Sequence, residues 1–170
     1  EETTKAIERI CAAQIAEFAR QRDPTTPAVL AAHLAAAAAT YSGSERSAII
    51  GSDPTFLTGI LANPEFNYVA LGHIHKFQDL NRDSSPPVVY AGSIERIDFG
   101  EELEEKGFCV VEIEPAVGSD RWRTEYEFIP TPARPFVTVR VDAEDALDPT
   151  KTILEAIDAC DIEDAVVRLL

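Results

Sequence analysis

The chain has 170 residues, enough for one full domain or for a partial domain followed by a small second unit. Its hydrophobic content of 45% is ordinary for a globular protein, and because it lacks any run of about eighteen apolar residues we expect no transmembrane helix. The formal net charge of −15, from 15 basic and 30 acidic residues, gives no sign of a basic nucleic-acid-binding surface.

The first half of the chain is predicted to contain two helices and two buried strands. Apolar residues recur at helical spacing from the N-terminus until Pro24 ends the pattern, and two short apolar runs bounded by turn residues are typical of buried strands. In chain order we expect a helix at 3–22, a strand at 28–32, an irregular stretch at 35–53, a short helix at 54–62 and a strand at 68–72.

The second half is predicted to be rich in strands. Two segments alternate between apolar and polar residues, which indicates strands with one wet face, and three prolines within residues 130–135 mark the clearest boundary in the chain. We expect a loop at 79–87, strands at 88–93, 108–114 and 123–129, and then a β-α-β unit formed by a strand at 136–142, a helix at 149–160 and a strand at 165–170. The expected fold class is therefore α/β or α+β.

The three cysteines are odd in number and lie far apart, at Cys11, Cys109 and Cys160. Because none belongs to a CxxC pair, the sequence favours free thiols over a disulfide framework or a thiolate zinc site. The N-terminal residues EETTKAIERI are polar and acidic, unlike a secretory signal. These features predict a cytoplasmic protein.

All three histidines of the chain follow predicted strands: His33 after the strand at 28–32, and His73 and His75 after the strand at 68–72. Open α/β sheets carry their functional groups at the carboxyl ends of the strands, and imidazole is the commonest metal ligand near neutral pH. In an extended segment, residues two apart point the same way, so His73 and His75 could face one metal or two adjacent ones. A histidine at a strand end is also commonly a hydrogen-bonded surface or core residue, and both interpretations remain open at this point.

A two-metal hydrolase also needs a bridging carboxylate. The candidates are Asp53, Asp79, Asp83 and Asp98, and none stands directly after an apolar strand, where a bridging ligand would be held rigidly. Residue patterns alone therefore describe only half of such a site.

Three longer segments resemble the second half of bacterial SbcD nucleases, which belong to the calcineurin-like metallophosphoesterase superfamily. These segments are YVALGHIHKFQ at 68–78, VVYAGSIERIDFGEELEEKGFCVVEIE at 88–114 and RPFVTVRVD at 134–142. The segment AAHLAAAAATYSGSERSAIIG at 31–51 is similar to the part of the family that carries an isolated histidine ligand. The motifs occur in the family's order, and the resemblance runs over essentially the whole chain.

The resemblance implies the C-terminal half of a metallophosphoesterase β-sandwich flanked by helices, at 1–132, followed by the start of a small β-α-β capping domain at 133–170. It implies two Mn²⁺ ions, with Mg²⁺ as an alternative. His33 and His73 would bind one ion and His75 the other, each imidazole being oriented by a partner that the sequence does not identify. The implied activity is metal-dependent phosphodiester hydrolysis, as a 3'-5' double-strand exonuclease and single-strand endonuclease. The implied partners are DNA, an SbcC-type ATPase subunit and a second copy of the full-length chain, with no membrane.

The chain also departs from the family's pattern. The early D-x-H, the G-D-x-x-D with its bridging aspartate and the G-N-H-[DE] with its catalytic histidine are all missing from the sequence. We therefore expect a C-terminal fragment of an enzyme, with no catalytic residue of its own and no activity alone. The alternatives are another metallophosphoesterase that acts on a small phosphodiester, and a non-catalytic binding module.

The candidates for DNA contact are Lys76, beside the histidine pair, and Arg96. Arg96 has the alternative role of holding its own loop through Glu95 or Asp98. Residues 41–46 (YSGSER) are expected in the loop after His33, where they could line the site.

Overall fold

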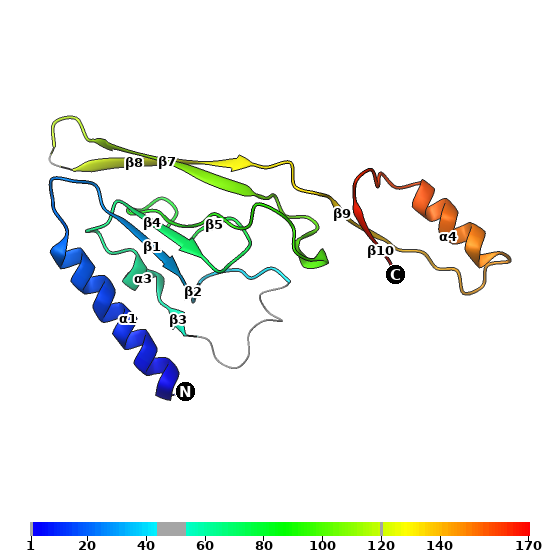
Figure 1. Cartoon of the computed structure of the whole chain (residues 1–170), viewed down its shortest axis with the longest axis horizontal. Coiled ribbons are helices and arrows are strands. Elements are labelled where there is room, and N and C mark those ends of the chain that lie inside the picture. The colour runs from blue at the N-terminus through cyan, green and yellow to red at the C-terminus, as the bar shows by residue number, and fades with distance from the viewer. Residues whose placement is uncertain (1, 44–53, 120) are drawn as a thin grey trace.

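The computed structural model describes residues 2–43, 54–119 and 121–170, which form an α+β fold (Figure 1). The helices described are α1 (Glu2–Gln21), α3 (Thr58–Leu61), α4 (Pro149–Asp158) and the 3-10 helix η1 (Phe99–Glu101). The strands are β1 (Val29–His33), β2 (Ala35–Ala36), β3 (Thr55–Phe56), β4 (Tyr68–Gly72), β5 (Gln78–Asp79), β6 (Val88–Tyr90), β7 (Gly107–Pro115), β8 (Trp122–Pro130), β9 (Phe136–Val139) and β10 (Val166–Leu169).

Most of the predicted elements are confirmed, with shifts at their ends. The strand predicted at 68–72 is β4, and the helix predicted at 3–22 is α1. The prediction of one short helix at 54–62 is wrong in extent, because β3 pairs with β2 there and leaves a helix of only four residues, α3. Part of the stretch predicted to be irregular forms β2, and its remainder at 44–53 lies outside the described residues.

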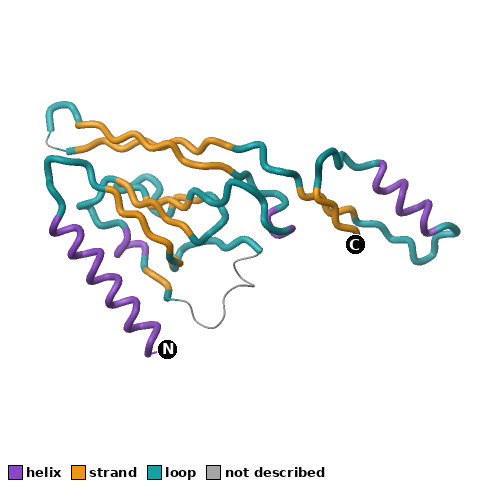
Figure 2. Tube along the Cα trace, viewed as in Figure 1, coloured by secondary structure: helices purple, strands orange, loops and turns teal. Residues whose placement is uncertain are grey.

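A four-stranded sheet positions the histidines. Its strand order is β1-β4-β6-β5, in which the first three strands run parallel and β5 runs antiparallel to β6. Figure 2 shows the strands of the chain in orange. The register pairs His33 at the end of β1 with Gly72 at the end of β4. Because parallel strands end at the same edge of a sheet, the residues that follow β1 and β4 emerge side by side.

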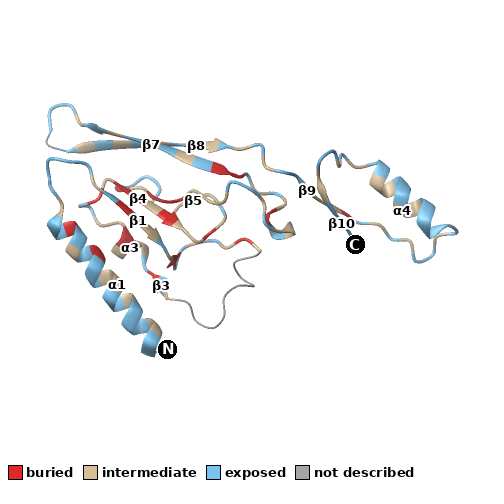
Figure 3. Ribbon diagram, in the orientation of Figure 1, coloured by how far each residue is buried: buried red, intermediate tan, exposed pale blue. Residues whose placement is uncertain are grey.

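The main core lies between this sheet and α1, as the distribution of buried residues in Figure 3 shows. Val69 and Leu71 of β4 pack in the same cluster as Ile15 of α1. The cluster also contains Tyr90 of β6, which is 0% exposed. Its hydroxyl donates to the carbonyl of Leu34 at 2.8 Å and accepts from the amide of Ala36 at 2.9 Å. Tyr90 therefore holds the chain segment that directly follows His33.

The long antiparallel hairpin β7–β8 packs through one face on the rest of the molecule. The rings of Phe77 and Phe128 stack with their centroids 4.2 Å apart. The hydroxyl of Tyr126 donates to Asp79 at 2.8 Å, and the other carboxylate oxygen of Asp79 accepts from the amide of Asn81 at 2.9 Å. Asp79, a candidate bridging carboxylate, thus serves to join the hairpin to β5.

The β-α-β unit predicted after residue 135 is present as β9, α4 and β10, and is called here the C-terminal unit (residues 136–170). Its two strands pair in parallel. The carboxylate of Asp148 caps α4 by accepting from the amide of Lys151 at 3.1 Å, and Pro149 opens the helix. No helix within the described residues has the length and apolar character needed to cross a membrane.

Candidate metal centre

Two imidazoles meet where β1 and β4 end. His33 is the last residue of β1 and His73 directly follows β4, and their ring centroids lie 5.4 Å apart with the planes at 75°. His73 has a φ of 97°, in the left-handed region that non-glycine residues seldom adopt. Such backbone strain concentrates at functional sites.

Gly72 leaves the space in which this juxtaposition forms. A Cβ atom added to Gly72 would lie 2.9 Å from Nδ1 of His33, closer than non-bonded carbon and nitrogen atoms approach. The missing side chain leaves the space in which the His33 ring sits across the neighbouring strand. Steric contact with the His33 ring therefore explains why a glycine precedes the histidine pair.

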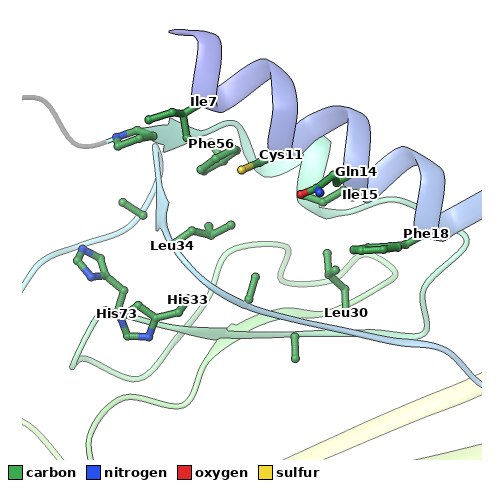
Figure 4. Close-up of a pocket in the computed structure, with 14 residues that line it drawn as sticks. Ile7, Cys11, Gln14, Ile15, Phe18, Leu30, His33, Leu34, Phe56 and His73 are labelled. Atoms are coloured by element: carbon green, nitrogen blue, oxygen red, sulfur yellow. The ribbon is translucent and has the colours of Figure 1, made fainter. Parts of the chain in front are cut away.

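The two rings stand at one end of an apolar cavity of about 430 Å³ between α1 and β1 (Figure 4). Its lining includes Cys11, Phe18 and Phe56 together with both histidines. Because its lining is mostly apolar, the cavity supplies few additional ligand atoms.

His75 is oriented by a carboxylate from another part of the chain. Its Nδ1 lies 2.9 Å from Oε1 of Glu101, whose side chain is 0% exposed. The other oxygen, Oε2, is 2.8 Å from Nζ of Lys106 and accepts from the amide of Ile97 at 3.2 Å. Nζ of Lys106 also donates to the backbone carbonyl of His75 at 3.1 Å. One buried ion pair therefore fixes both the ring and the backbone of His75.

The charge on Glu101 follows from these contacts. Burial raises the pKa of this carboxyl, but the hydrogen bonds from Lys106, His75 and the amide of Ile97 lower it by more, so the net pKa lies below its ordinary value. Glu101 is then an ionised acceptor, and Nδ1 of His75 carries the proton that it receives. When the ring is neutral, this arrangement leaves its lone pair on Nε2. Histidines that ligate a metal through one nitrogen and donate to a carboxylate through the other have the same arrangement.

The predicted set of three metal ligands is thus only partly brought together. His33 and His73 are adjacent, whereas His75 is directed to Glu101. Across residues 2–43, 54–119 and 121–170, no group of three His, Cys, Asp or Glu side chains is arranged to hold a metal ion. The described chain offers two neighbouring imidazoles and a third that is held separately, so further ligands would have to come from elsewhere.

Of the carboxylates considered as bridging ligands, two have other partners. Asp79 binds Tyr126, and Asp98 caps η1 by accepting from the amide of Gly100 at 2.6 Å. Asp83 lies in a turn with a φ of 66°. Asp53 lies outside the described residues, as do residues 44–46 of the loop expected to line the site. In the described part of that loop, Ser42 donates to Glu104 at 2.9 Å.

Arg96 holds its loop, although by contacts other than those expected. Its guanidinium donates to neither of the expected side chains, Glu95 and Asp98. It donates instead to four backbone carbonyls, those of Glu101 (3.2 Å), Glu104 (2.7 Å), Ala133 (3.2 Å) and Arg134 (3.2 Å). It thereby ties the η1 loop to the segment that leads into the C-terminal unit. Lys76 is exposed next to His75, and DNA contact by Lys76 or Arg96 stays a prediction.

Sequence reasoning missed Glu101 and Lys106. Both lie in the acidic stretch GEELEEKG, where hydropathy indicates a solvated loop, yet Glu101 is 0% and Lys106 2% exposed. The one signal available was a single lysine at the end of an acidic run. No protein-family model matches the sequence of the chain.

Proposed function

We propose that this chain is the C-terminal part of an SbcD-type, metal-dependent DNA nuclease. His33 and His73 would ligate one ion and His75 a second. One observation carries the proposal: two imidazoles meet at the carboxyl edge of a parallel sheet, and a third nearby in sequence is oriented by a buried carboxylate. The motifs that continue beyond the histidine pair favour this family over other metallophosphoesterases.

The donor set suits Mn²⁺ as part of a larger site. Imidazole nitrogens bind first-row transition metals, and carboxylates from the remainder of a complete protein would supply the harder ligands. Two bound ions would lower the pKa of a water and neutralise charge on the scissile phosphate. The residues of this chain would position the ligands for that chemistry. Gly72 leaves room for the His33 ring, and Glu101 orients the ring of His75.

The net charge of −15 fits this proposal only if DNA affinity arises largely elsewhere. Affinity for DNA rests on Lys and Arg that neutralise phosphates, and bound metal ions reverse the local sign of the field. The complete enzyme would therefore draw its DNA affinity from its metals, from the rest of its chain and from an SbcC-type ATPase partner. The cytoplasmic location and the homodimer belong to the same proposal.

Metal binding can be tested on the 170-residue chain by NMR. The three histidines give three sets of ring signals, which single His→Gln substitutions assign. Traces of paramagnetic Mn²⁺ should broaden the ring signals of the proposed ligands His33, His73 and His75 at concentrations that leave those of distant aromatic rings unchanged. Equal broadening of all aromatic rings would show that these imidazoles do not bind the ion.

Activity requires the complete protein. With Mn²⁺ and linear duplex DNA, His73→Ala should abolish digestion, while Arg123→Ala, which removes an exposed side chain on β8, should leave it unchanged. Equal digestion by the wild type and His73→Ala would rule out His73 as a ligand. Digestion of small phosphodiesters but not DNA would favour another metallophosphoesterase, and no hydrolysis of either would favour a binding module.

A further inference from the structure

A second pocket lies away from the histidines, where the η1 loop meets the C-terminal unit. It has a volume of about 340 Å³ and is lined by Phe99 and Glu102 on the loop side and by Thr138, Arg140 and Arg168 on the sheet side. Two guanidinium groups in one pocket are unusual in a chain with twice as many acidic as basic residues.

Arg168 is fixed in place. Its guanidinium carbon lies 4.3 Å from the centroid of the Phe99 ring, and its NH2 group donates to Oγ1 of Thr138 at 2.9 Å. Stacking on an aromatic face and one hydrogen bond hold a planar cation at low entropic cost. Its Nε is buried and has no hydrogen-bond partner among the described residues, so the internal contacts of the pocket do not satisfy this side chain.

Glu102 forms no ion pair with either arginine, although the hydrogen bonds from Thr138 and, to a smaller extent, the charges of Arg168 and Arg140 lower the pKa of its carboxyl. Its two carboxylate oxygens accept from the amide of Thr138 at 2.9 Å and from the hydroxyl of Thr138 at 2.6 Å. Arg140 is exposed, and within the described part of the chain no hydrogen bond or ion pair engages its guanidinium. Because two arginines and one glutamate line the pocket, the charges of its lining side chains sum to a net positive charge.

We propose that this pocket binds a phosphate group between Arg140 and Arg168. Guanidinium groups match the geometry of phosphate oxygens and form charge-assisted hydrogen bonds with them. At physiological salt the Debye length is about 8 Å, so the acidic surface elsewhere opposes this binding only weakly. The phosphate comes from the backbone of a nucleic acid, and this assignment rests on the proposed nuclease function. The inference that the pocket binds a phosphate group rests on the two arginines alone.

The test uses the 170-residue chain and inorganic phosphate, titrated at constant ionic strength and followed by ¹H–¹⁵N NMR of the backbone and arginine Nε–H groups. Signals of Thr138, Arg140 and Arg168 should shift. Arg140→Gln should weaken phosphate binding about tenfold, the loss expected for one charge-assisted hydrogen bond. Arg123→Gln is the matched control, because it removes the same charge from an exposed pair with Glu125 and should change binding less than about twofold.

Arg168→Gln removes the stacked cation, and Arg168→Lys keeps the charge but loses the planar group; both should weaken phosphate binding. Should either variant unfold, Arg140→Gln alone decides, because Arg140 has no internal hydrogen bond to lose within the described residues. Equal phosphate affinity in Arg140→Gln and Arg123→Gln would overturn the proposal, as would phosphate shifts that leave this pocket unchanged.

A fluorescein-labelled DNA duplex distinguishes the source of the phosphate. Binding followed by anisotropy over a salt series should show a slope that falls by about one in Arg140→Gln. Phosphate binding that depends on Arg140, with DNA binding that does not, would assign the pocket to a small phosphorylated ligand and refute the nucleic-acid source. The Mn²⁺ broadening of His33 and His73 is measured on the same variants and should not change. A negative result for the phosphate pocket can therefore be distinguished from a negative result for metal binding by the histidines.

Discussion

Replacing Lys106 with methionine should be among the most destabilising single changes in the chain. The side chains of Lys106 and Glu101 are both 0% exposed, and Nζ lies 2.8 Å from Oε2. Methionine fills a similar volume but leaves the carboxylate of Glu101 buried without its cation. Breaking a buried ion pair from one side costs about 3–5 kcal/mol, whereas a typical domain has only about 5–15 kcal/mol of stability in total.

Urea unfolding followed by far-UV circular dichroism and by the fluorescence of Trp122, the single tryptophan, measures this loss. The matched control is Lys151→Met, which removes a lysine 3.7 Å from Glu155 in a pair with side chains 70% and 68% exposed. That change should cost less than about 0.5 kcal/mol. The double variant Glu101→Leu/Lys106→Met removes both charges and should be more stable than Lys106→Met alone.

A cost of less than about 1 kcal/mol for Lys106→Met would refute this role of the ion pair, since a buried carboxylate that loses its cation is destabilised by more than that. A double variant that is no more stable than the single one would refute it equally. In that case the destabilisation would come from lost packing or from the other contacts of Lys106, which reach Glu104 at 3.0 Å and the carbonyl of His75 at 3.1 Å.

Three further outcomes are expected. Tyr90→Phe removes a fully buried hydroxyl and leaves a backbone amide and carbonyl after His33 without their partner, so it should lower the free energy of unfolding by about 1–3 kcal/mol in urea. Burial raises the pKa of Tyr90 from 10.0 to about 12, outweighing the hydrogen bond from the amide of Ala36. The folded state therefore favours the protonated phenol. The contribution of this hydroxyl to the free energy of unfolding is complete below pH 10 and is lost as the pH rises through about 12. The difference in stability between the wild type and Tyr90→Phe should shrink over that range. Gly72→Ala should displace the His33 ring and weaken the Mn²⁺ broadening of His33 and His73. Gly59→Ala should leave the broadening intact, because beyond its chain neighbours and its own helix backbone the added carbon would meet no atom within 4 Å. Equal broadening in both variants would contradict the steric account.

The sequence was a good guide where local pattern decides structure. A continuous apolar run predicted both ends of β4 correctly, because a strand buried on both faces has no polar positions. Alternation predicted β7 and β8, because their hairpin has one wet face. Of the three prolines before Phe136, Pro130 ends β8, and Pro132 and Pro135 lie in the segment without regular structure between β8 and β9.

The sequence failed where contacts join distant residues. Glu101 lies 26 positions from His75, and nothing in the periodicity of GEELEEKG distinguishes this buried glutamate from its solvated neighbours. Arg96 likewise takes its partners from backbone carbonyls as far away as Arg134, which composition cannot reveal. For the histidines, the residue pattern predicted the ends of two strands, and His33 does end β1 while His73 directly follows β4. The resemblance assigned His33 and His73 to one ion and His75 to another, but neither it nor the residue pattern identified Glu101 as the partner of His75.

Glu101 and Glu102 are consecutive residues that serve different parts of the molecule. Glu101 accepts from His75 and Lys106 beside the sheet, and Glu102 accepts from Thr138 in the C-terminal unit. A 3-10 helix has about 3.0 residues per turn, so inserting or deleting one residue in η1 would rotate one carboxylate by about a third of a turn and separate it from its partner. The loop should therefore tolerate exchange of Leu103, which is 96% exposed, while its length stays fixed. Insertions and deletions in related chains should fall outside this turn, even where the residues around it vary freely.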